Sequence, residues 1–435
     1  MKEQSKNKEG NENIKRMKAM KGMKHIPIIL CTLSSLMAGG TVLGQERPGI
    51  EGILQQIELH NRELQAATQL ARAEKLEQKS SNNLPDPTLS YAHLWDSKDK
   101  NITVGELVVS QSFDFPTRYL SRGGMNRHLY SSIDAATEAT RQRILLEAKL
   151  LCIEITTLNR QQKLLKERME QAEKLAKLYQ KRLQEGDANL IETNKIELER
   201  LNARTEYRLG EIAILNKTQQ LLALNGNQPL LPGRPTPLGP AIPTADALGL
   251  DHFNEQPLPG DLVTLMGELM ETDPSLRALK SRQLAAEKSI GLNKQGWLPR
   301  LELGYRRNTE SGHPLNGVVV GFSFPLFENR SKVKSARSQA TGLKLQREDA
   351  LDKEQARLSR LYEEAYQLQQ SISEYQNALS AQQNLTLLEK ALMEGQISLI
   401  DYFVEVSIIY QSQSNLFALE GEYQRAVAEL YRSRL

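Results

Sequence analysis

The side chains best suited to chemistry are few in this chain of 435 residues, and they are not grouped. Its six histidines are widely separated, and none lies at the short spacing of a zinc-ligand pair. The sequence has no GxSxG, Walker or GxGxxG motif, and its carboxylates are spread along helical stretches as on solvated faces. We therefore predict that the protein is not an enzyme, with no catalytic residues, no metal and no cofactor.

Two cysteines are present, and neither pattern indicates a reactive thiol. Cys31 follows Leu30 within an apolar run, whereas a lipoprotein signal places a small residue before the cysteine, so we expect no lipid anchor. Cys152 falls in a helical seam, where a cysteine packs as a small apolar residue. It would be the only cysteine after removal of residues 1–44, which excludes an intrachain disulfide.

Residues 1–44 have the pattern of an export signal, with lysines, the apolar run Ile26 to Leu36, and small residues near Gly44, where we expect cleavage. The apolar run is shorter than the roughly 20 residues that a transmembrane helix needs. This favours a signal peptide over a membrane anchor. Three later methionines would each begin a more ordinary signal peptide, so the start stays open among Met1, Met17, Met20 and Met23.

Composition indicates an extended rather than a compact protein. Aromatic residues make up 5% of the chain, and its mean hydropathy is −0.49. The 56 basic and 53 acidic residues are scattered along the sequence, so no nucleic-acid surface is expected. A solvated coiled coil has this composition.

The sequence contains an internal repeat. Phe113-Asp114-Phe115-Pro116 recurs as Phe322-Ser323-Phe324-Pro325, and the motif that begins at Gly186 recurs at Gly395. Both motifs recur after 209 residues, so the stretch between them has one length in both halves. A rigid element of fixed length explains this. We place the first repeat at 45–227, a Pro-rich linker at 228–260 and the second repeat at 261–435.

Each half presents the same series of elements. A helical stretch, 50–80 or 262–294, precedes a proline-marked break and two alternating segments expected to be strands. The expected strands are 88–94 and 102–115, then 301–305 and 318–324, with turns at 96–101 and 308–317. A long helix then runs to the glycine, and a return helix follows over 189–224 or 398–431.

Apolar residues recur along the long helix at coiled-coil spacing. About 68 residues at 1.5 Å each give a rod of roughly 100 Å. The return helix covers about half of that length, and the helix before the strands has close to the missing length. Two shorter helices end to end can therefore flank each long one. The fold class is mainly α with a small β part.

Four strands are too few to span a bilayer alone, because only a closed barrel satisfies the backbone of strands in lipid. The chain must therefore oligomerise. Two copies could close a small barrel of about 8 strands and three would form a wider pore; the strand count does not choose between them.

The doubled series of helix, Leu84-Pro85-Asp86-Pro87, strand pair, Phe-x-Phe-Pro, long helix and Gly-x-x-x-Leu-Ile-acidic turn resembles the TolC-like outer-membrane efflux proteins. The resemblance covers nearly the whole mature chain. It implies a homotrimer in outer-membrane lipid, with a 12-stranded barrel and a periplasmic helical tunnel. It also implies that the tips dock on a periplasmic adaptor protein served by an inner-membrane pump of the RND or ABC type.

The resemblance also assigns site residues. Two sets would form the periplasmic tip and adaptor contact: Gly186, Asp187, Leu190, Ile191 and Glu192, and Gly395, Ser398, Leu399, Ile400 and Asp401. Threefold symmetry would place Glu192 and Asp401 in acidic rings at the pore mouth, although both also fit ordinary solvated helix ends. The positions of the family's polar lock carry Leu392 and Ile397, which suggests an apolar aperture. Aromatic residues at the membrane edge, or simply packed at the junction, would be Phe113, Phe115, Phe322 and Phe324.

Two alternatives remain at this stage. A periplasmic adaptor is also exported and also carries a helical hairpin, but it would show one hairpin in a split β domain. A purely structural coiled coil would lack the amphipathic strand pairs. The doubled hairpin therefore favours the outer-membrane channel of an efflux or type I secretion system, and the cargo stays open among drugs, metal ions, lipids and proteins.

Overall fold

The computed structural model describes residues 47–99, 103–231, 242–253, 258, 260–310, 313–380 and 385–435. They belong to one compact unit, Arg47–Leu435. The predicted signal peptide lies outside the described residues, as does much of the 228–260 linker. No helix in the described ranges is both long enough and apolar enough to cross a membrane.

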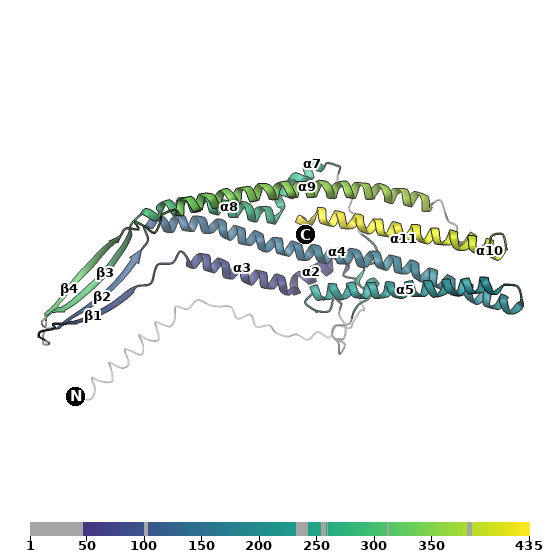
Figure 1. Ribbon diagram of the computed structural model, residues 1–435, viewed down its shortest axis with the longest axis horizontal. Coiled ribbons are helices and arrows are strands. Elements are labelled where there is room, and N and C mark those ends of the chain that lie inside the picture. The colour runs from purple at the N-terminus through teal and green to yellow at the C-terminus, as the bar shows by residue number, and fades with distance from the viewer. Residues whose placement is uncertain are drawn as a thin grey trace, which may run out of the picture. The chain divides into compact units, whose positions relative to one another are not determined.

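Four strands form one antiparallel sheet in the order β1-β2-β3-β4. They are β1 (Thr88–Trp95), β2 (Thr103–Phe113), β3 (Arg300–Glu310) and β4 (His313–Ser323). The central pairing of β2 with β3 joins the two repeats, and Val109 faces Tyr305 across it. The sheet lies at one end of the unit, and the turns of both helical hairpins lie at the other (Figure 1).

The two strands of the second repeat are longer than predicted. We expected a turn over 308–317, but β3 continues to Glu310 and β4 begins at His313. Asparagine, proline and glycine in this stretch suggested a loop. Pro314 is the second residue of β4, which is an edge strand of the sheet, and edge strands are where sheets tolerate proline.

The long helix of the first repeat, α4 (Pro116–Glu185), is continuous over 70 residues, as expected. It begins with proline at its first turn, where no backbone donor is lost. Helices α2 (Gly49–His60) and α3 (Arg62–Ser80) flank the half of α4 nearest the sheet, and α5 (Leu190–Leu224) flanks the other half (Figure 1). The predicted end-to-end arrangement of two shorter helices is confirmed.

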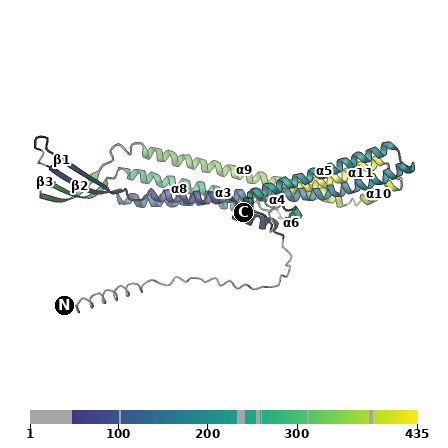
Figure 2. The same cartoon turned by 90° about the horizontal axis from the view of Figure 1, so that it is seen from below.

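The second repeat has the same plan with a later start. Its helices are α7 (Leu262–Thr272), α8 (Pro274–Lys294), α9 (Lys332–Ser380), α10 (Leu385–Met393) and α11 (Leu399–Leu430). Helix α8 lies along α9 near the sheet, and α11 lies along the more distant part, as both views show (Figures 1 and 2). A short 3-10 helix, η1 (Gln295–Trp297), connects α8 to β3, and another, η2 (Arg432–Arg434), follows α11.

The prediction that this long helix starts at Pro325 was wrong. Residues 326–331 form turns, and Ser331 has a φ of +69°, which an uninterrupted helix excludes. The buried Asn329 donates a side-chain hydrogen bond to the carbonyl oxygen of Gly296. The segment therefore folds back onto η1, just after α8, before α9 begins.

The helices before the strands, predicted as continuous, are each broken once. Asn61 separates α2 from α3, and Asp273 separates α7 from α8. Each break residue is buried and its side chain accepts a hydrogen bond from the backbone N–H three residues later. A polar cap inside an amphipathic stretch starts a new helix there.

Midway along the helices, the two repeats bury equivalent clusters. Ile53, Ile57 and Leu221 pack together in the first, and Leu265, Leu269 and Leu430 in the second. The first cluster is larger because the described part of the linker, including α6 (Ala245–Leu248), packs against it. Cys152 lies in this cluster and is fully buried, as predicted for a small apolar residue.

Candidate channel wall and hairpin tips

The sheet has one strongly apolar face. Because side chains alternate along strands, the pairing register assigns every residue to a face. One face carries Leu89, Tyr91, Trp95, Leu107, Val109, Leu301, Leu303, Tyr305, Val318, Val320 and Phe322. The opposite face carries the more polar set Thr88, Ser90, Glu106, Ser110, Ser112, Glu302, Arg306 and Asn308. On this second face, Arg306 and Glu106 form an ion pair at 2.8 Å.

Many side chains on the apolar face are exposed in the single chain. Val318 is 81% exposed and Leu89 72% exposed, although a soluble sheet would cover such a face. Both outer strands also have an open side, because β1 pairs only with β2 and β4 only with β3 among the described residues. A sheet with one lipid-like face and two open edges is suited to closing into a ring with copies of itself.

The two hairpin turns have the same backbone geometry. Gly186 and Gly395 have φ angles of +82° and +72°, the left-handed conformation that favours glycine at a helix end. In each turn the N–H after the glycine bonds a carbonyl five residues earlier, from Asp187 to Arg182 and from Gln396 to Ala391, both at 2.8 Å. The predicted glycine-centred turns are present in both repeats.

The acidic residue of each turn lies in the first turn of the return helix. Asn189 caps α5 by accepting the N–H of Glu192 at 2.8 Å, and Ser398 caps α11 by accepting that of Asp401 at 3.1 Å. The Ser398 hydroxyl also donates to the Asp401 carboxylate at 2.6 Å. Negative charge is favourable there because the helix N-terminus is electropositive. These carboxylates therefore have a structural role in the single chain, whatever else they do in an assembly.

The predicted contact residues differ between the tips. Leu190 and Ile191 are 62% and 69% exposed, whereas Leu399 is 6% exposed and Ile400 56%. Gly186, Asp187, Gly395, Ser398 and Asp401 are exposed, and Glu192 is half-buried. The structure thus brings each predicted set to one turn, but only the first turn presents both apolar residues.

A hydrophobic cluster between the hairpins explains the buried leucine. Leu399, Tyr402 and Tyr410 of α11 pack against Tyr179 of α4 and Ile196 of α5. The Tyr410 hydroxyl donates to the Gln171 side-chain oxygen at 2.7 Å. Burial raises the pKa of Tyr402 and Tyr410, so both phenols stay neutral at physiological pH. The predicted aperture residues lie at this cluster, with Leu392 buried in it and Ile397 half-buried against it.

The four aromatic residues expected at the membrane edge also differ between repeats. Phe113 and Phe115 are half-buried, whereas Phe322 and Phe324 are 60% and 63% exposed. All four lie where strands meet helices.

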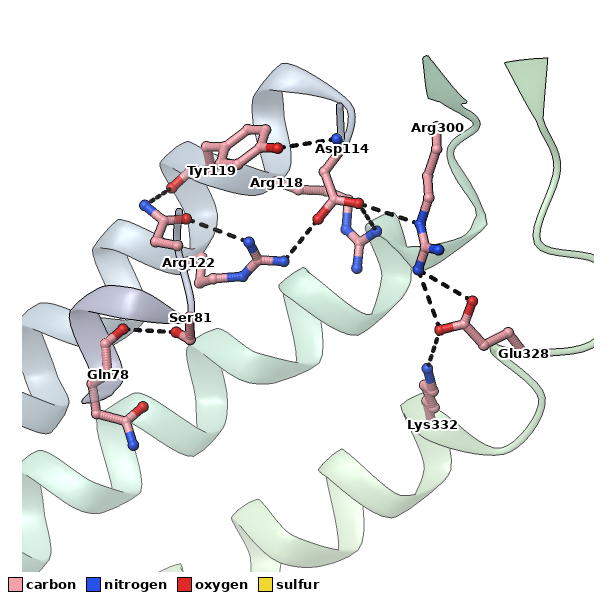
Figure 3. Close-up of polar contacts among 10 residues, drawn as sticks. Gln78, Ser81, Asp114, Arg118, Tyr119, Arg122, Arg300, Glu328 and Lys332 are labelled. Atoms are coloured by element: carbon pink, nitrogen blue, oxygen red, sulfur yellow. Dashed lines mark hydrogen bonds and ion pairs between the residues drawn. The ribbon is translucent and has the colours of Figure 1, made fainter. Parts of the chain in front are cut away.

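Sequence reasoning missed an ionic cluster at that junction (Figure 3). Asp114 pairs with Arg118 at 3.0 Å, with Arg122 at 2.9 Å and with Arg300 at 3.4 Å. Arg300 also pairs with Glu328, which binds Lys332 at 3.1 Å (Figure 3). The cluster links the ends of β2, β3, α4 and α9. Two features of the sequence could have revealed this cluster. Asp114 replaces the uncharged Ser323 of the second repeat, and Arg118 and Arg122 follow it at helical spacing.

Residues 265–433, which make up most of the second repeat, match the family described as Outer membrane efflux protein. The first repeat folds into the same series of elements. The family match therefore covers the second repeat, about two fifths of the chain. No curated protein matches the chain.

Solved structures share the fold of nearly the whole chain. CusC has a TM-score of 0.71 at 15% identity, covering 94% of this chain and 98% of CusC. VceC from Vibrio cholerae has a TM-score of 0.68 at 16% identity, covering 88% and 95%. The Campylobacter jejuni channel CmeC has a TM-score of 0.71 at 13% identity, covering 88% and 85%. At this identity the likeness establishes the fold.

The matched family is described as outer membrane efflux proteins, and the structures of CusC and CmeC are described as those of channels. The comparisons give no support to the periplasmic-adaptor alternative, since the fold of known outer-membrane channels extends over both repeats.

Proposed function

We propose that three copies of this chain form one passive export channel of the outer-membrane efflux type, with a 12-stranded barrel in the outer membrane and a helical tunnel in the periplasm. The observation that carries the proposal is the sheet, which combines an exposed apolar face with open edges at β1 and β4. Pairing β4 of one copy with β1 of the next would satisfy both edges. Three sheets of four strands would then enclose the polar face as the channel lining.

The hairpin tips are proposed to dock on a periplasmic adaptor, which connects the channel to an inner-membrane pump of the RND or ABC type. The exposed Leu190, Ile191 and Ile400 lie beside polar turns at the end of the unit opposite the sheet (Figure 1). Exposed apolar side chains that lie together beside polar residues mark protein–protein contact sites. Glu192 and Asp401 would ring the pore mouth by symmetry, and Leu392 and Ile397 are proposed to back the aperture.

Export is proposed to use residues 1–44 as a signal peptide, cleaved near Gly44, with no lipid attached to the chain. The signal-peptide proposal is independent of the channel proposal, because residues 1–44 lie outside the described part of the chain.

Membrane fractionation tests the channel proposal. We expect the protein in the outer-membrane fraction as a complex of three chains that resists SDS until it is heated. A soluble monomer in the periplasm would contradict the proposal.

A photo-crosslinking residue at Ile191 or Ile400 tests the tip assignment. We expect adducts with a periplasmic adaptor, identified by mass spectrometry, from both positions. The same probe at the exposed Leu345 of α9 is the control and should give no adaptor adduct. Adducts at the tips only with other copies of the chain would show that the tips are internal to the assembly.

A further inference from the structure

The apolar face of the sheet carries one charged side chain, Arg307, for which the described residues supply no ion-pair partner. This side chain is exposed. Its neighbour Arg306 points to the opposite face and pairs with Glu106 at 2.8 Å. Consecutive arginines thus face opposite environments, and only the one on the channel-lining side is neutralised by the protein.

The pairing register places Arg307 on the apolar face. It lies opposite Leu107 on β2 and Asn316 on β4, and Leu107 lies opposite Tyr91 on β1. The Tyr305 hydroxyl donates to the Asn316 side-chain oxygen at 2.6 Å, which confirms that these side chains share the face. Arg307 therefore belongs to the surface that meets lipid if the proposed barrel forms.

The pairing register also gives the position of Arg307 along the strands, measured from the end of the sheet where the helices begin. About 20 Å of strand separates the Phe322 pairing row from the Arg307 row at roughly 3.3 Å per residue. An apolar band on such barrels is about 25 Å tall and its strands are tilted. Arg307 thus lies in the outer half of the band, on the side away from the helices, and its long side chain can reach the band's edge.

Aromatic residues mark the same edge. Tyr91 and Trp95 are 67% and 66% exposed, and the rings of His93 and Trp95 lie 6.1 Å apart. Aromatic side chains gather at the two interfaces of a membrane barrel. A cation on the lipid face is strongly unfavourable at the midplane of the bilayer and nearly neutral close to an interface. The position of Arg307 is therefore tolerable only where polar lipid groups are within reach.

We propose that Arg307 binds a phosphate group of lipopolysaccharide in the outer leaflet of the outer membrane. The guanidinium fork matches the geometry of a phosphate and forms paired charge-assisted hydrogen bonds with it. This inference rests on the proposed barrel. It adds a lipid-binding site on the outside of the channel, which the export function itself does not require.

Binding of purified lipopolysaccharide to the trimer in phosphatidylcholine nanodiscs tests the site. We expect Arg307→Gln to weaken binding about tenfold, the change that corresponds to losing about 1.4 kcal/mol. Arg306→Gln, the matched control on the other face, should bind as the wild type does. Arg307→Lys should retain part of the affinity, because it keeps the charge but loses the fork.

Three results would overturn the inference. They are equal binding of lipopolysaccharide by wild type and Arg307→Gln, undiminished binding of dephosphorylated lipopolysaccharide, and equally tight binding of phosphatidylglycerol added to the same phosphatidylcholine nanodiscs. Electrophoresis of the same samples in SDS without heating separates the two proposals. If the wild type forms an SDS-resistant trimer and lipopolysaccharide binding fails, only the lipid site is wrong. If the wild type forms no such trimer, the proposed barrel is wrong as well.

Discussion

The two hairpin tips have the same backbone conformation but differ in which of their side chains are buried. Both have a left-handed glycine and a capped return helix. In the first tip Leu190 is 62% exposed, whereas its repeat equivalent Leu399 is 6% exposed in the cluster between the hairpins. Both repeats therefore keep the glycine turn, which needs particular backbone angles. The leucine that follows the turn is exposed in the first repeat and packed inside the cluster in the second.

The opposite ends of the repeats differ in a related way. At the first junction, Asp114 joins three arginines from α4 and β3, and α4 starts directly at Pro116. At the second, Ser323 carries no charge and a turn precedes α9. The first repeat thus contributes the anion at the junction and an exposed leucine at its tip, whereas the second has an uncharged serine and a buried leucine at the equivalent positions.

The largest expected effect is on the packed tip. Leu399→Ala should destabilise the α10–α11 turn by about 3 kcal/mol, because it removes a buried leucine from the cluster. Leu190→Ala should cost under about 0.5 kcal/mol, as for an exposed position. Hydrogen exchange should show roughly hundredfold faster opening for the first variant. Equal effects would mean that the tips are packed alike in the assembled protein.

The ionic junction should show the next largest effect. Asp114→Asn leaves Arg118, Arg122 and Arg300 close together without their shared anion, and we expect a loss of about 2 kcal/mol. Ser323→Ala, the matched change in the second repeat, should cost under about 0.5 kcal/mol. The temperature at which the SDS-resistant complex dissociates measures both. A similar decrease in both variants would show that the Asp114 cluster stabilises the complex no more than the uncharged second junction does.

The glycines should behave identically. Gly186→Ala and Gly395→Ala should each cost about 1 kcal/mol, because an L-residue is strained at a positive φ. Neither glycine has another atom within 4 Å of the position that a Cβ would occupy, so sterics with neighbours add nothing. Denaturant unfolding of each variant checks this. A clear difference between them would show that the turns are not equivalent.

The smallest expected effect concerns Cys152. Burial raises the pKa of its thiol to about 12, so the thiol stays protonated and unreactive well above neutral pH. Iodoacetamide should leave the native protein unlabelled at pH 8 and react after unfolding. The repeat equivalent Leu361 is similarly buried, at 2% exposed, and Leu361→Cys should be equally protected. Rapid labelling of either native thiol would show that its cluster opens.

The sequence predicted the repeated series because fixed-length helices and glycine turns leave direct patterns. It indicated that the residues of each tip set are neighbours, since Leu190 and Glu192 lie within one turn of Gly186, and their contact with an adaptor stays a prediction. It did not predict that Leu399 is buried, because this depends on α4 and α5 of the other hairpin. The Asp114 cluster was missed for the same reason, as Arg300 is distant in sequence.

The most direct test of the trimeric channel is a disulfide between β1 and β4 of neighbouring copies. Cysteines are placed at exposed apolar-face positions on both edges, such as Leu89 and Val320, in a Cys152→Ala background, with several registers sampled. Oxidation of outer membranes should link three chains into one covalent product in at least one register. Only monomers in every register, or a ladder without an endpoint at three, would contradict the account.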